Sequence, residues 1–509
     1  MKYSNSVLAD AKFKNFLAIG IGLLLRIIGI NSRPIWYDEA FALLFSPAGL
    51  AEMTKGTLTL DATGQTSDVH PLGYYFILGQ WMDIFGESII SARILSIFFG
   101  FFTLIIIFYL ANMFFNKEHV WIPLLLTALS PFALHYSQEI RMYSLMAFGL
   151  ATATLALFKG MKDSRWGWWL LFAVSSAIAQ YAQQLSAVYL ISLALIPVFK
   201  RHKTAIICTV LGGFGAIILY LPWLINLPNQ LSSISTYWIQ KPLLSRFLTL
   251  FLVYVAGLPV GTILVFPGFG LAMVLIVFAL ISSMRIVKYE KQQSRDGFWF
   301  CYLAFFPPVL LWLISQIRPV YIERALLMSS IAFVIWVAWL VVHPRTPVFE
   351  RMILVVTILA GSLIGFFQHL DGSHFPYAPY AELIDEIQEN RSMGEVIVHS
   401  NKLSFLPMHY YNRDLIGQKF IADFEGGITD TLAPATQTVL GIQESENLDA
   451  AVRGARGVWF LIFEQAILEA TEGGEAQHPH ISWLDQHFKL VNAELRDGIW
   501  LMHYQAKDQ

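Results

Sequence analysis

The chain has 509 residues, of which 56% are hydrophobic and only 14% are charged. Ordinary soluble domains carry about 25% charged residues, so the composition excludes an ordinary soluble protein and indicates a polytopic protein of a lipid bilayer. The formal net charge is −2, and we expect no nucleic-acid partner.

The small net charge conceals two parts of opposite charge. Residues 1–370 hold 25 of the 34 Lys and Arg residues and 15 of the 36 Asp and Glu residues, whereas residues 371–509 hold the remaining 9 and 21. We therefore predict a transmembrane domain over 1–370, with an outer loop at 32–92, and a soluble α/β domain over 371–509.

Apolar runs of membrane length recur from Phe16 to Phe367, and the basic clusters in the short loops set their orientation. If all these clusters face the cytoplasm, the chain crosses the plasma (inner) membrane eleven times, with its N-terminus in the cytoplasm and residues 371–509 on the extracytoplasmic side. The predicted crossings are 16–31, 93–115, 119–135, 142–159, 166–182, 184–199, 204–224, 262–284, 298–316, 325–342 and 352–369.

Two shorter apolar segments are predicted not to cross. Leu72–Phe85 begins and ends on the outer face in this scheme, and its fourteen residues suit an interfacial or re-entrant helix. The same interpretation applies to Phe247–Leu258. If Leu72–Phe85 does cross, the loops that follow it no longer agree with the basic-residue count.

The first unusual polar motif, Trp36-Tyr37-Asp38-Glu39-Ala40, directly follows the first apolar run. An acid at membrane depth costs roughly 2.5–3.5 kcal/mol on insertion scales, so a retained one suggests function. Two adjacent carboxylates suit general-base chemistry, because each charge raises the pKa of the other. The alternative is that both acids only mark the membrane boundary, which the flanking aromatic residues also fit.

A second acidic motif, Asp68-Val69-His70-Pro71, stands at the start of the next apolar helix. Together with Asp38 and Glu39 it indicates chemistry at the membrane surface. Proline in a first helical turn is structurally ordinary, however, and Asp68 alternatively serves only as an N-cap.

Three arginines are predicted on the outer face, against the positive-inside trend. Arg141 follows Glu139 at a helix–helix junction, and Arg93 and Arg324 each stand at the start of another helix. Snorkelling explains most single arginines near helix ends, and Glu139 with Arg141 alternatively forms a structural pair. Three together favour a shared anionic ligand such as a phosphate, which the planar guanidinium group binds with two hydrogen bonds.

The last 139 residues have the pattern of a small sheet with flanking helices. Helices are predicted at Ala381–Asn390 and Phe405–Tyr411, and turns at Gly426-Gly427 and Gly473-Gly474. Strand-like or β-rich segments are Glu395–His399, Thr436–Ile442, Gly457–Phe463, Phe488–Val491 and Ile499–Tyr504.

Cysteine usage indicates neither a disulfide nor a metal site. Cys208 and Cys301 both lie inside apolar runs, where core packing is the simpler interpretation, and the sequence has no metal-spaced His/Cys cluster.

Taken together, the polar motifs resemble the polyprenol-phosphate-sugar-dependent glycosyltransferases of the GT-C fold. The similar families are glycosyltransferase family 39, with the protein O-mannosyltransferases, and the bacterial aminoarabinose transferase that modifies lipid A. The resemblance covers about residues 16–200 well, the later helices loosely and residues 371–509 hardly at all. It rests on Trp36–Ala40, Asp68–Tyr75, Gly86-Glu87 with Arg93, and Leu129–Pro131 followed by Tyr136–Tyr143.

This resemblance implies a GT-C membrane protein of about eleven transmembrane helices with an extracytoplasmic α/β domain. Such an enzyme moves a sugar, with inversion, from a polyprenyl-phosphate-sugar donor to a hydroxyl of a lipid, protein or envelope-polymer acceptor. It implies Asp38 as the general base and Glu39 as a catalytic residue that orients acceptor or sugar. The implied substrate-binding residues are Asp68, His70, Arg93, Glu139, Arg141, Tyr143 and Arg324, with Arg141 foremost at the departing phosphate.

The sequence departs from the family pattern at two places. The usual double proline after the histidine is Pro71-Leu72 here, and the late basic Arg-Tyr motif reads Glu323-Arg324-Ala325. The resemblance requires no cofactor, because family 39 enzymes work without metal, but other GT-C enzymes bind a divalent cation through a similar acidic motif. Metal use is therefore left open.

A transporter or flippase of lipid-linked sugars is the alternative function. It would also be polytopic and carry charges at membrane depth. The sequence has no pair of inverted halves with Gly/Pro-broken helices in matching positions, which favours the transferase.

Overall fold

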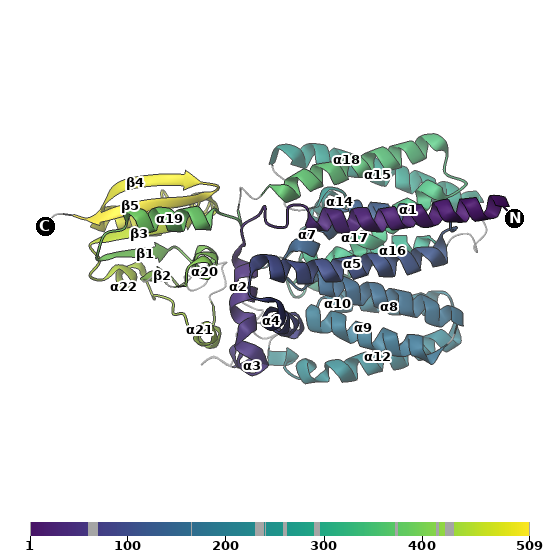
Figure 1. Cartoon of the computed structure of the whole chain (residues 1–509), viewed down its shortest axis with the longest axis horizontal. Helices are drawn as coiled ribbons and strands as arrows, with labels where there is room; N and C mark the ends of the chain where they lie inside the picture. Colours follow the sequence, from purple (N-terminus) through teal and green to yellow (C-terminus); the bar gives the residue numbers. More distant parts are fainter. Residues whose placement is uncertain are drawn as a thin grey trace.

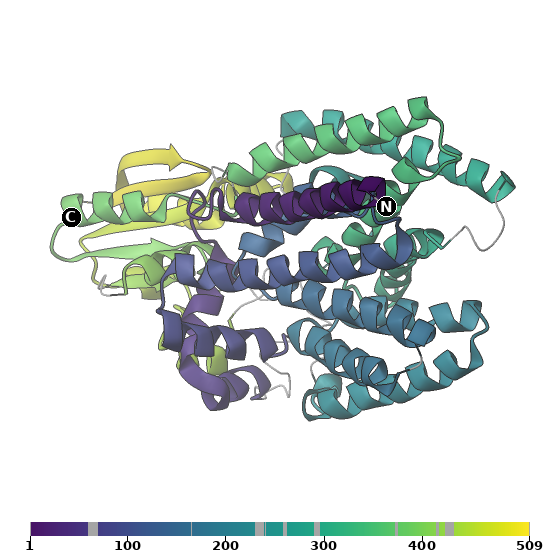
Figure 2. The same ribbon diagram turned by 45° about the vertical axis from the view of Figure 1, so that its right-hand side comes forward.

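The computed structural model describes residues 2–59, 70–163, 165–229, 239, 241–257, 262–289, 296–371, 375–413, 417–422 and 432–507. A bundle of long helices stands beside a smaller sheet domain, which lies at one end of the bundle (Figure 1). The N-terminus lies at the opposite end of the bundle. The turned view shows the same arrangement (Figure 2).

The bundle is built from apolar helices, most of which bury one face against the others. Among the described residues, seven helical segments have the length and composition to cross a membrane, so the predicted count of eleven is not confirmed. These seven lie in α5 (Ile89–Phe114), α8 (Tyr143–Asp163), α12 (Lys203–Leu224), α15 (Thr262–Tyr289), α16 (Phe298–Ser315), α17 (Leu327–Val342) with the preceding turn η4 (Glu323–Leu326), and α18 (Val348–Leu370).

Other predicted crossings fall on shorter or broken helices. The predicted span 119–135 covers two helices that part at Ser130, because Pro131 starts the second, and the span 184–199 divides in the same way before Pro197. The remaining bundle helices are α1 (Lys2–Ile27), α6 (Trp121–Leu129), α7 (Pro131–Gln138), α9 (Trp166–Ala182), α10 (Ser186–Ala194), α11 (Ile196–Phe199) and α14 (Arg246–Ala256).

Short helices close the end of the bundle that faces the sheet domain. They are α2 (Tyr37–Phe45), the turn η1 (Ser46–Ala48), α3 (Gly49–Leu58) and α4 (Gly73–Phe85), and α2 runs across the long helices rather than along them (Figure 1). The predicted interfacial helix corresponds to α4, which has 13 residues. Gly79 of α4 lets this helix approach the backbone of Ser46 closely.

The sheet domain confirms the predicted α/β class. Its five strands have the order β2-β1-β3-β5-β4, with β1 parallel to both neighbours and β5 antiparallel to β3 and β4. The strands are β1 (Glu395–His399), β2 (Gln418–Phe420), β3 (Gly457–Phe463), β4 (Phe488–Arg496) and β5 (Ile499–Ala506). Every residue of β3 is buried, because helices cover both faces of the sheet.

The helices of this domain are α19 (Tyr380–Asn390), α20 (Lys402–Tyr411), α21 (Pro434–Leu440), α22 (Leu448–Val452), α23 (Glu464–Glu472) and α24 (Pro479–His487). The predicted helices, four of the five predicted strand segments and the turn at Gly473-Gly474 agree with these elements. Gly426-Gly427 lies outside the described residues. The assignment of 1–370 and 371–509 to separate domains stays a prediction.

The β-rich interpretation of Thr436–Ile442 is wrong, because this segment forms helix α21. Pro434 starts the helix and Gly441 ends it in the left-handed conformation, which are the usual boundary residues of a helix. The helix packs on α3, and the Thr436 hydroxyl donates to the Gly56 carbonyl over 3.0 Å. Tertiary contact thus overrides the strand preference of a short apolar run.

The sheet domain is fastened to the short helices of the bundle end. Helix α20 packs on α2 as α21 does on α3. The Tyr410 hydroxyl donates to the Glu87 carbonyl over 2.8 Å, and buried Arg33 donates to the Tyr377 hydroxyl over 2.9 Å. The domain therefore supports the helix that carries Asp38.

Close helix packing at α18 gives a testable prediction. A side chain at Gly365 would meet the Ala256 carbonyl oxygen and the ring of Pro131. We expect Gly365→Ala to destabilise the protein by about 1–3 kcal/mol through overpacking, measured by thermal unfolding in detergent. Gly213→Ala in α12, where an added methyl group meets nothing within 4 Å, is the matched control and gains about 0.5–1 kcal/mol from helix propensity. Equal effects of both substitutions would contradict the packing argument.

Candidate active site

The candidate active site is built around the first turn of α2, where Asp38 and Glu39 stand side by side. Trp36 is the N-cap residue and its side chain does not cap the helix. Acidic residues in a first turn are favoured by the helix dipole. Successive helical residues point about 100° apart, so the two carboxylates face different partners.

Glu39 turns inward and pairs with Arg93 of α5. The Arg93 Nε and Nη2 atoms lie 3.3 and 3.2 Å from the two carboxylate oxygens, and both side chains are about 1–2% exposed. Arg93 also donates to the carbonyls of Ile30 and Arg33 over 2.7 and 3.0 Å. Glu39 in turn accepts from the Ile140 backbone amide over 3.0 Å.

The Glu39–Arg93 pair therefore joins α2, α5, the segment after α1 and the segment after α7. The N–H groups of Arg93 donate to Glu39 and to backbone carbonyls of the protein, so the geometry gives this residue a positioning role. Its predicted contact with a substrate stays a prediction.

Asp38 turns toward two other arginines. Its Oδ2 atom lies 3.0 Å from Arg324 Nη1 and 3.3 Å from Arg141 Nη2, and its side chain is 14% exposed. Burial alone would raise the pKa of Asp38, but the two guanidinium groups, with His70 contributing less, hold it below the ordinary value. In this state Asp38 is an ionised carboxylate and a weak base.

The two arginines come from distant parts of the chain and are held on their other sides. Arg141, between α7 and α8, donates to the Tyr75 hydroxyl of α4 over 3.1 Å. Arg324 of η4 lies 5.5 Å from the centre of the Tyr143 ring and 6.0 Å from that of Trp36, within the range of cation–π attraction. The Tyr143 hydroxyl is buried with no partner among the described residues.

Glu139 is the third carboxyl group of the cluster. Its Oε1 atom accepts from Trp36 Nε1 over 3.0 Å, while its buried Oε2 atom has no partner among the described residues. Burial raises the pKa of Glu139 to about 7, and the Glu39 carboxylate adds to this rise. The sequence alternatively suggests a structural pair of Glu139 and Arg141. Among the described residues these two side chains form no ion pair, and Arg141 pairs with Asp38 instead.

The second acidic motif is described only in part. His70 is half-buried and lies close enough to Asp38 to lower its pKa. Asp68 falls outside the described residues. The predicted site residues Asp38, His70, Arg141, Tyr143 and Arg324 thus come together with Glu139, and Glu39 and Arg93 stand behind them.

Sequence reasoning underestimated two aromatic residues. The sequence suggests only a membrane-boundary role for Trp36, but its side chain donates to Glu139 and faces Arg324. Tyr75 holds Arg141. Both residues lie inside the motifs that carried the resemblance, which was the available signal.

The described residues contain no group of three or more His, Cys, Asp or Glu side chains arranged to hold a metal ion. Two guanidinium groups already occupy Asp38 Oδ2, so the described donor set does not fit a divalent cation there. Asp68 is not included in this statement.

Residues 69–226 match the sequence profile of a family described as dolichyl-phosphate-mannose-protein mannosyltransferase. No curated protein matches the sequence. The structure is similar to the crystal structure of ArnT from Cupriavidus metallidurans in the apo state, with a TM-score of 0.61 and 10% identity over 96% of this chain and 97% of that chain. It is also similar to ArnT bound to undecaprenyl phosphate, with a TM-score of 0.59, 10% identity and the same coverage of both chains.

At this identity the likeness shows a shared fold. The predicted GT-C fold, with helices followed by a small C-terminal α/β domain, is confirmed over nearly the whole chain. The profile match begins beyond Asp38 and Glu39 and includes His70, Glu139 and Arg141.

The buried ion pair gives a stability prediction. Glu39→Gln leaves Arg93 charged and buried without a carboxylate, so we expect a loss of about 3–5 kcal/mol in the free energy of unfolding. Glu52→Gln on α3 is the matched control, because Glu52 forms an exposed pair with Lys55 at 3.5 Å, worth about 0–1 kcal/mol. A Glu39→Gln protein as stable as the control would show that the pair does not hold these segments.

Glu139 gives a pH prediction. Its pKa in the folded protein, about 7, is higher than the ordinary 4.5, so the folded state binds the proton more tightly than the unfolded state. Stability from this group is therefore complete below about pH 4.5 and is lost as the pH rises through 7. Glu139→Gln has no titrating carboxyl group at this position, so it does not lose this stability as the pH rises. The free energy of unfolding of the variant minus that of the original protein should therefore increase between pH 5 and pH 8. A difference that stays constant over this range would contradict the raised pKa.

Proposed function

We propose that this chain is a membrane glycosyltransferase that moves a sugar from a polyprenyl-phosphate-linked donor to an acceptor hydroxyl on the extracytoplasmic face of the membrane. The observation that carries the proposal is the meeting of Asp38 with Arg141 and Arg324 at one end of a membrane bundle. The mannosyltransferase family profile and the ArnT fold support it, and one ArnT structure contains undecaprenyl phosphate.

Arg141 and Arg324 suit the binding of the donor phosphate. Both guanidinium groups are fixed by other contacts, through Tyr75 for Arg141 and through aromatic rings for Arg324. A phosphate that leaves the sugar gains negative charge, and preorganised cations in a site with little water stabilise that charge strongly. Arginine also binds phosphate oxygens through paired hydrogen bonds.

Asp38 is the proposed general base, and donor binding would prepare it. Both arginines lie beside the Asp38 carboxylate and lower its pKa. A phosphate diester would compete for the same two guanidinium groups. As the phosphate shares the charge of these two groups, Asp38 loses part of its counter-charge, its pKa rises, and it becomes a better proton acceptor.

The proposed reaction is a single displacement. The acceptor hydroxyl gives its proton to Asp38 while its oxygen forms a bond to the anomeric carbon. The bond between that carbon and the phosphate oxygen breaks on the opposite side, so the polyprenyl phosphate leaves with the bonding electrons and the anomeric centre inverts.

Other residues would bind and orient the reactants. The free Oε2 atom of Glu139 and the free hydroxyl of Tyr143 are buried polar groups without partners among the described residues, and sugar or acceptor hydroxyls would satisfy them. His70 lies beside Asp38, and Asp68 is proposed to line the same space. Glu39 and Arg93 position the cluster.

The proposed location is the plasma (inner) membrane, with the N-terminus in the cytoplasm and the C-terminal domain and active site outside. Its support is the placement of basic residues, which gather in loops predicted to face the cytoplasm. The N-terminus and the sheet domain lie at opposite ends of the bundle (Figure 1), as this orientation requires. The acceptor is a lipid, a protein or an envelope polymer.

Sugar transfer by the purified full chain tests the function directly. Radiolabelled polyprenyl-phosphate sugars would be offered as donors, with native membrane extract as acceptor. We expect Asp38→Asn to reduce transfer at least 100-fold, because the amide cannot accept the proton. Asp83→Asn is the matched control, since Asp83 is an exposed acid of α4 that accepts a hydrogen bond from exposed Gln80, and it should leave transfer unchanged.

Two further outcomes decide between the alternatives. Full transfer by Asp38→Asn would show that Asp38 is not the general base. A parallel measurement with a chelator tests metal dependence. No transfer from any donor, together with transbilayer movement of labelled lipid in vesicles, would replace the transferase with a flippase.

A further inference from the structure

Three carboxyl groups and three arginines meet in the candidate site, and their pairing is selective. They are Asp38, Glu39, Glu139, Arg93, Arg141 and Arg324. Asp38 and Glu39 take up all three arginines at ion-pair distance. Glu139 forms no ion pair within the described part of the chain. Burial raises its pKa, and the charges of Arg324 and Arg141 are near enough to oppose this rise. The missing pair needs a cause, because carboxylate and guanidinium attract each other strongly where water is scarce.

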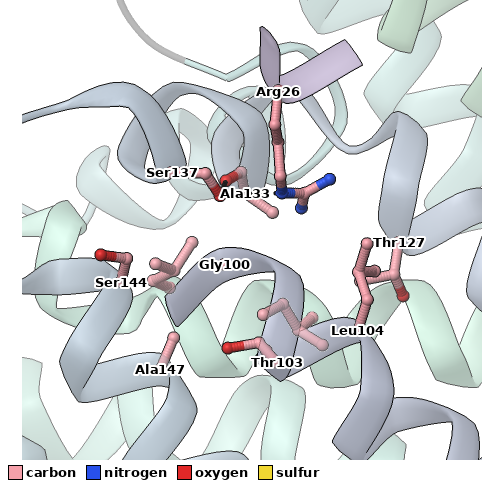
Figure 3. A pocket seen from close by; sticks show the side chains of 11 residues that line it. Arg26, Gly100, Thr103, Leu104, Thr127, Ala133, Ser137, Ser144 and Ala147 are labelled. Atoms are coloured by element: carbon pink, nitrogen blue, oxygen red, sulfur yellow. Dashed lines mark hydrogen bonds between the residues drawn. The ribbon is translucent and has the colours of Figure 1, made fainter. Parts of the chain in front are cut away.

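Burial alone does not give an arginine of this bundle an acidic partner. Arg26 of α1 is 2% exposed, and it donates to the Ser137 hydroxyl over 3.1 Å and to the Gly22 carbonyl over 2.9 Å. It borders a cavity of about 10 Å³, seen from close by in Figure 3. Within the described part of the chain, no acidic side chain lies at ion-pair distance from it. Pairing therefore depends on which acid the surrounding structure places within reach.

The side chain of Trp36 contacts both Glu139 and Arg324. Its Nε1 atom donates to Glu139 Oε1 over 3.0 Å, and the Arg324 guanidinium carbon lies 6.0 Å from the centre of its ring. The Trp36 carbonyl accepts from the Ala40 amide over 2.9 Å at the start of α2. The indole ring is thereby attached to the same helical turn that carries Asp38.

Arg324 is bordered by aromatic rings where it does not meet Asp38. Its Nη1 atom lies 3.0 Å from Asp38 Oδ2, and the Tyr143 ring centre lies 5.5 Å from its guanidinium carbon. Each ring occupies space beside the guanidinium group that a carboxylate would otherwise take. Trp36 thus both holds the Glu139 carboxyl group by a hydrogen bond and covers part of Arg324.

We propose that Trp36 is a positioning residue that keeps Glu139 from pairing with Arg324 and so leaves Arg324 available for the donor phosphate. This role rests on the proposed function. With Glu139 held away, Arg324 shares its charge with Asp38 and with an arriving phosphate. The same hydrogen bond leaves the second carboxyl oxygen of Glu139, Oε2, open for a hydroxyl group of a reactant.

The first test measures stability and needs no substrate. Trp36→Phe removes the indole N–H group and keeps an aromatic ring beside Arg324. If Trp36 acts as proposed, the released Glu139 carboxylate pairs with Arg324, and this ion pair lowers the pKa of Glu139 from about 7 toward its ordinary value. Glu139 then no longer reduces stability as the pH rises from 5 to 8. In the Trp36→Phe background, Glu139→Gln should therefore change the free energy of unfolding by nearly the same amount at both pH values.

A released Glu139 that stays unpaired gives the opposite result. Without the Trp36 N–H group its charged form loses a hydrogen bond, so the pKa of Glu139 rises further. The effect of Glu139→Gln would then grow between pH 5 and pH 8 by more than in the original protein. That outcome, or an effect that grows as in the original protein, overturns the proposal. The charges of Glu39, Asp38 and Arg141, which also face Glu139, are present in every variant compared.

Trp459→Phe is the matched control. In β3, Trp459 Nε1 donates to Glu395 Oε2 over 2.8 Å, so this variant loses the same kind of hydrogen bond away from the cluster. It should leave the pH dependence of the Glu139→Gln effect as in the original protein. If Trp36→Phe folds only when combined with Glu139→Gln, the released carboxylate is the cause and the proposal is supported. Failure of both to fold would leave the ring a packing role only and would overturn it.

The second test measures binding of undecaprenyl phosphate to the purified full chain in detergent at pH 8. We expect Trp36→Phe to weaken binding roughly tenfold, within the range for residues coupled in one network, and the double variant with Glu139→Gln to recover it. Unchanged binding in Trp36→Phe, or no recovery in the double variant, would overturn the proposal. An original protein that binds no undecaprenyl phosphate would contradict the proposed function instead, and the pH comparison would still decide the role of Trp36.

Discussion

The buried ion pair between Glu39 and Arg93 is the interaction on which the rest of the candidate site depends. It fixes the first turn of α2 against α5, and the other donors of Arg93 hold the carbonyls of Ile30 and Arg33. Glu39 also accepts from the Ile140 amide, which places the segment that carries Glu139 and Arg141. Four segments far apart in sequence are thereby held at one point.

Because α2 is a helix, fixing Glu39 also fixes the direction of the neighbouring Asp38 side chain. Since Glu39 points into the bundle, Asp38 is rotated by about 100° toward Arg141 and Arg324. Two neighbouring acids of one motif therefore have different tasks. Two guanidinium groups face one ionised carboxylate, while Glu139 with a pKa of about 7 is partly protonated near neutral pH. This balance leaves positive charge available for an anionic donor.

The sheet domain contributes by supporting the same helix. Helix α20 packs on α2, and the Lys402 ammonium group lies 5.7 Å from the centre of the Tyr37 ring. The Tyr411 hydroxyl accepts from the Ile35 amide over 3.5 Å. The domain thus contacts the residues directly before Asp38. A C-terminal domain that showed hardly any resemblance in sequence is, in space, a neighbour of the proposed catalytic carboxylate.

The sequence by itself determined the membrane class, the ordered polar motifs and most elements of the sheet domain. These features depend on composition and on periodicity within a few residues, and both can be read directly from the sequence. It also placed Asp38, Arg141 and Arg324 among the candidate site residues. It did not determine that α21 is a helix, because the contact of Thr436 with Gly56 spans 380 positions.

Only the tertiary structure decided which acid pairs with which arginine. Glu39 and Arg93 are 54 positions apart, and Asp38 and Arg324 are 286 apart. The local pattern also suggests Glu139 as the partner of Arg141, which is two residues away. In the packed structure Arg141 instead pairs with Asp38, and Glu139 accepts a hydrogen bond from Trp36. Pairings over such separations follow from how whole helices pack, and no local pattern in the chain records that packing.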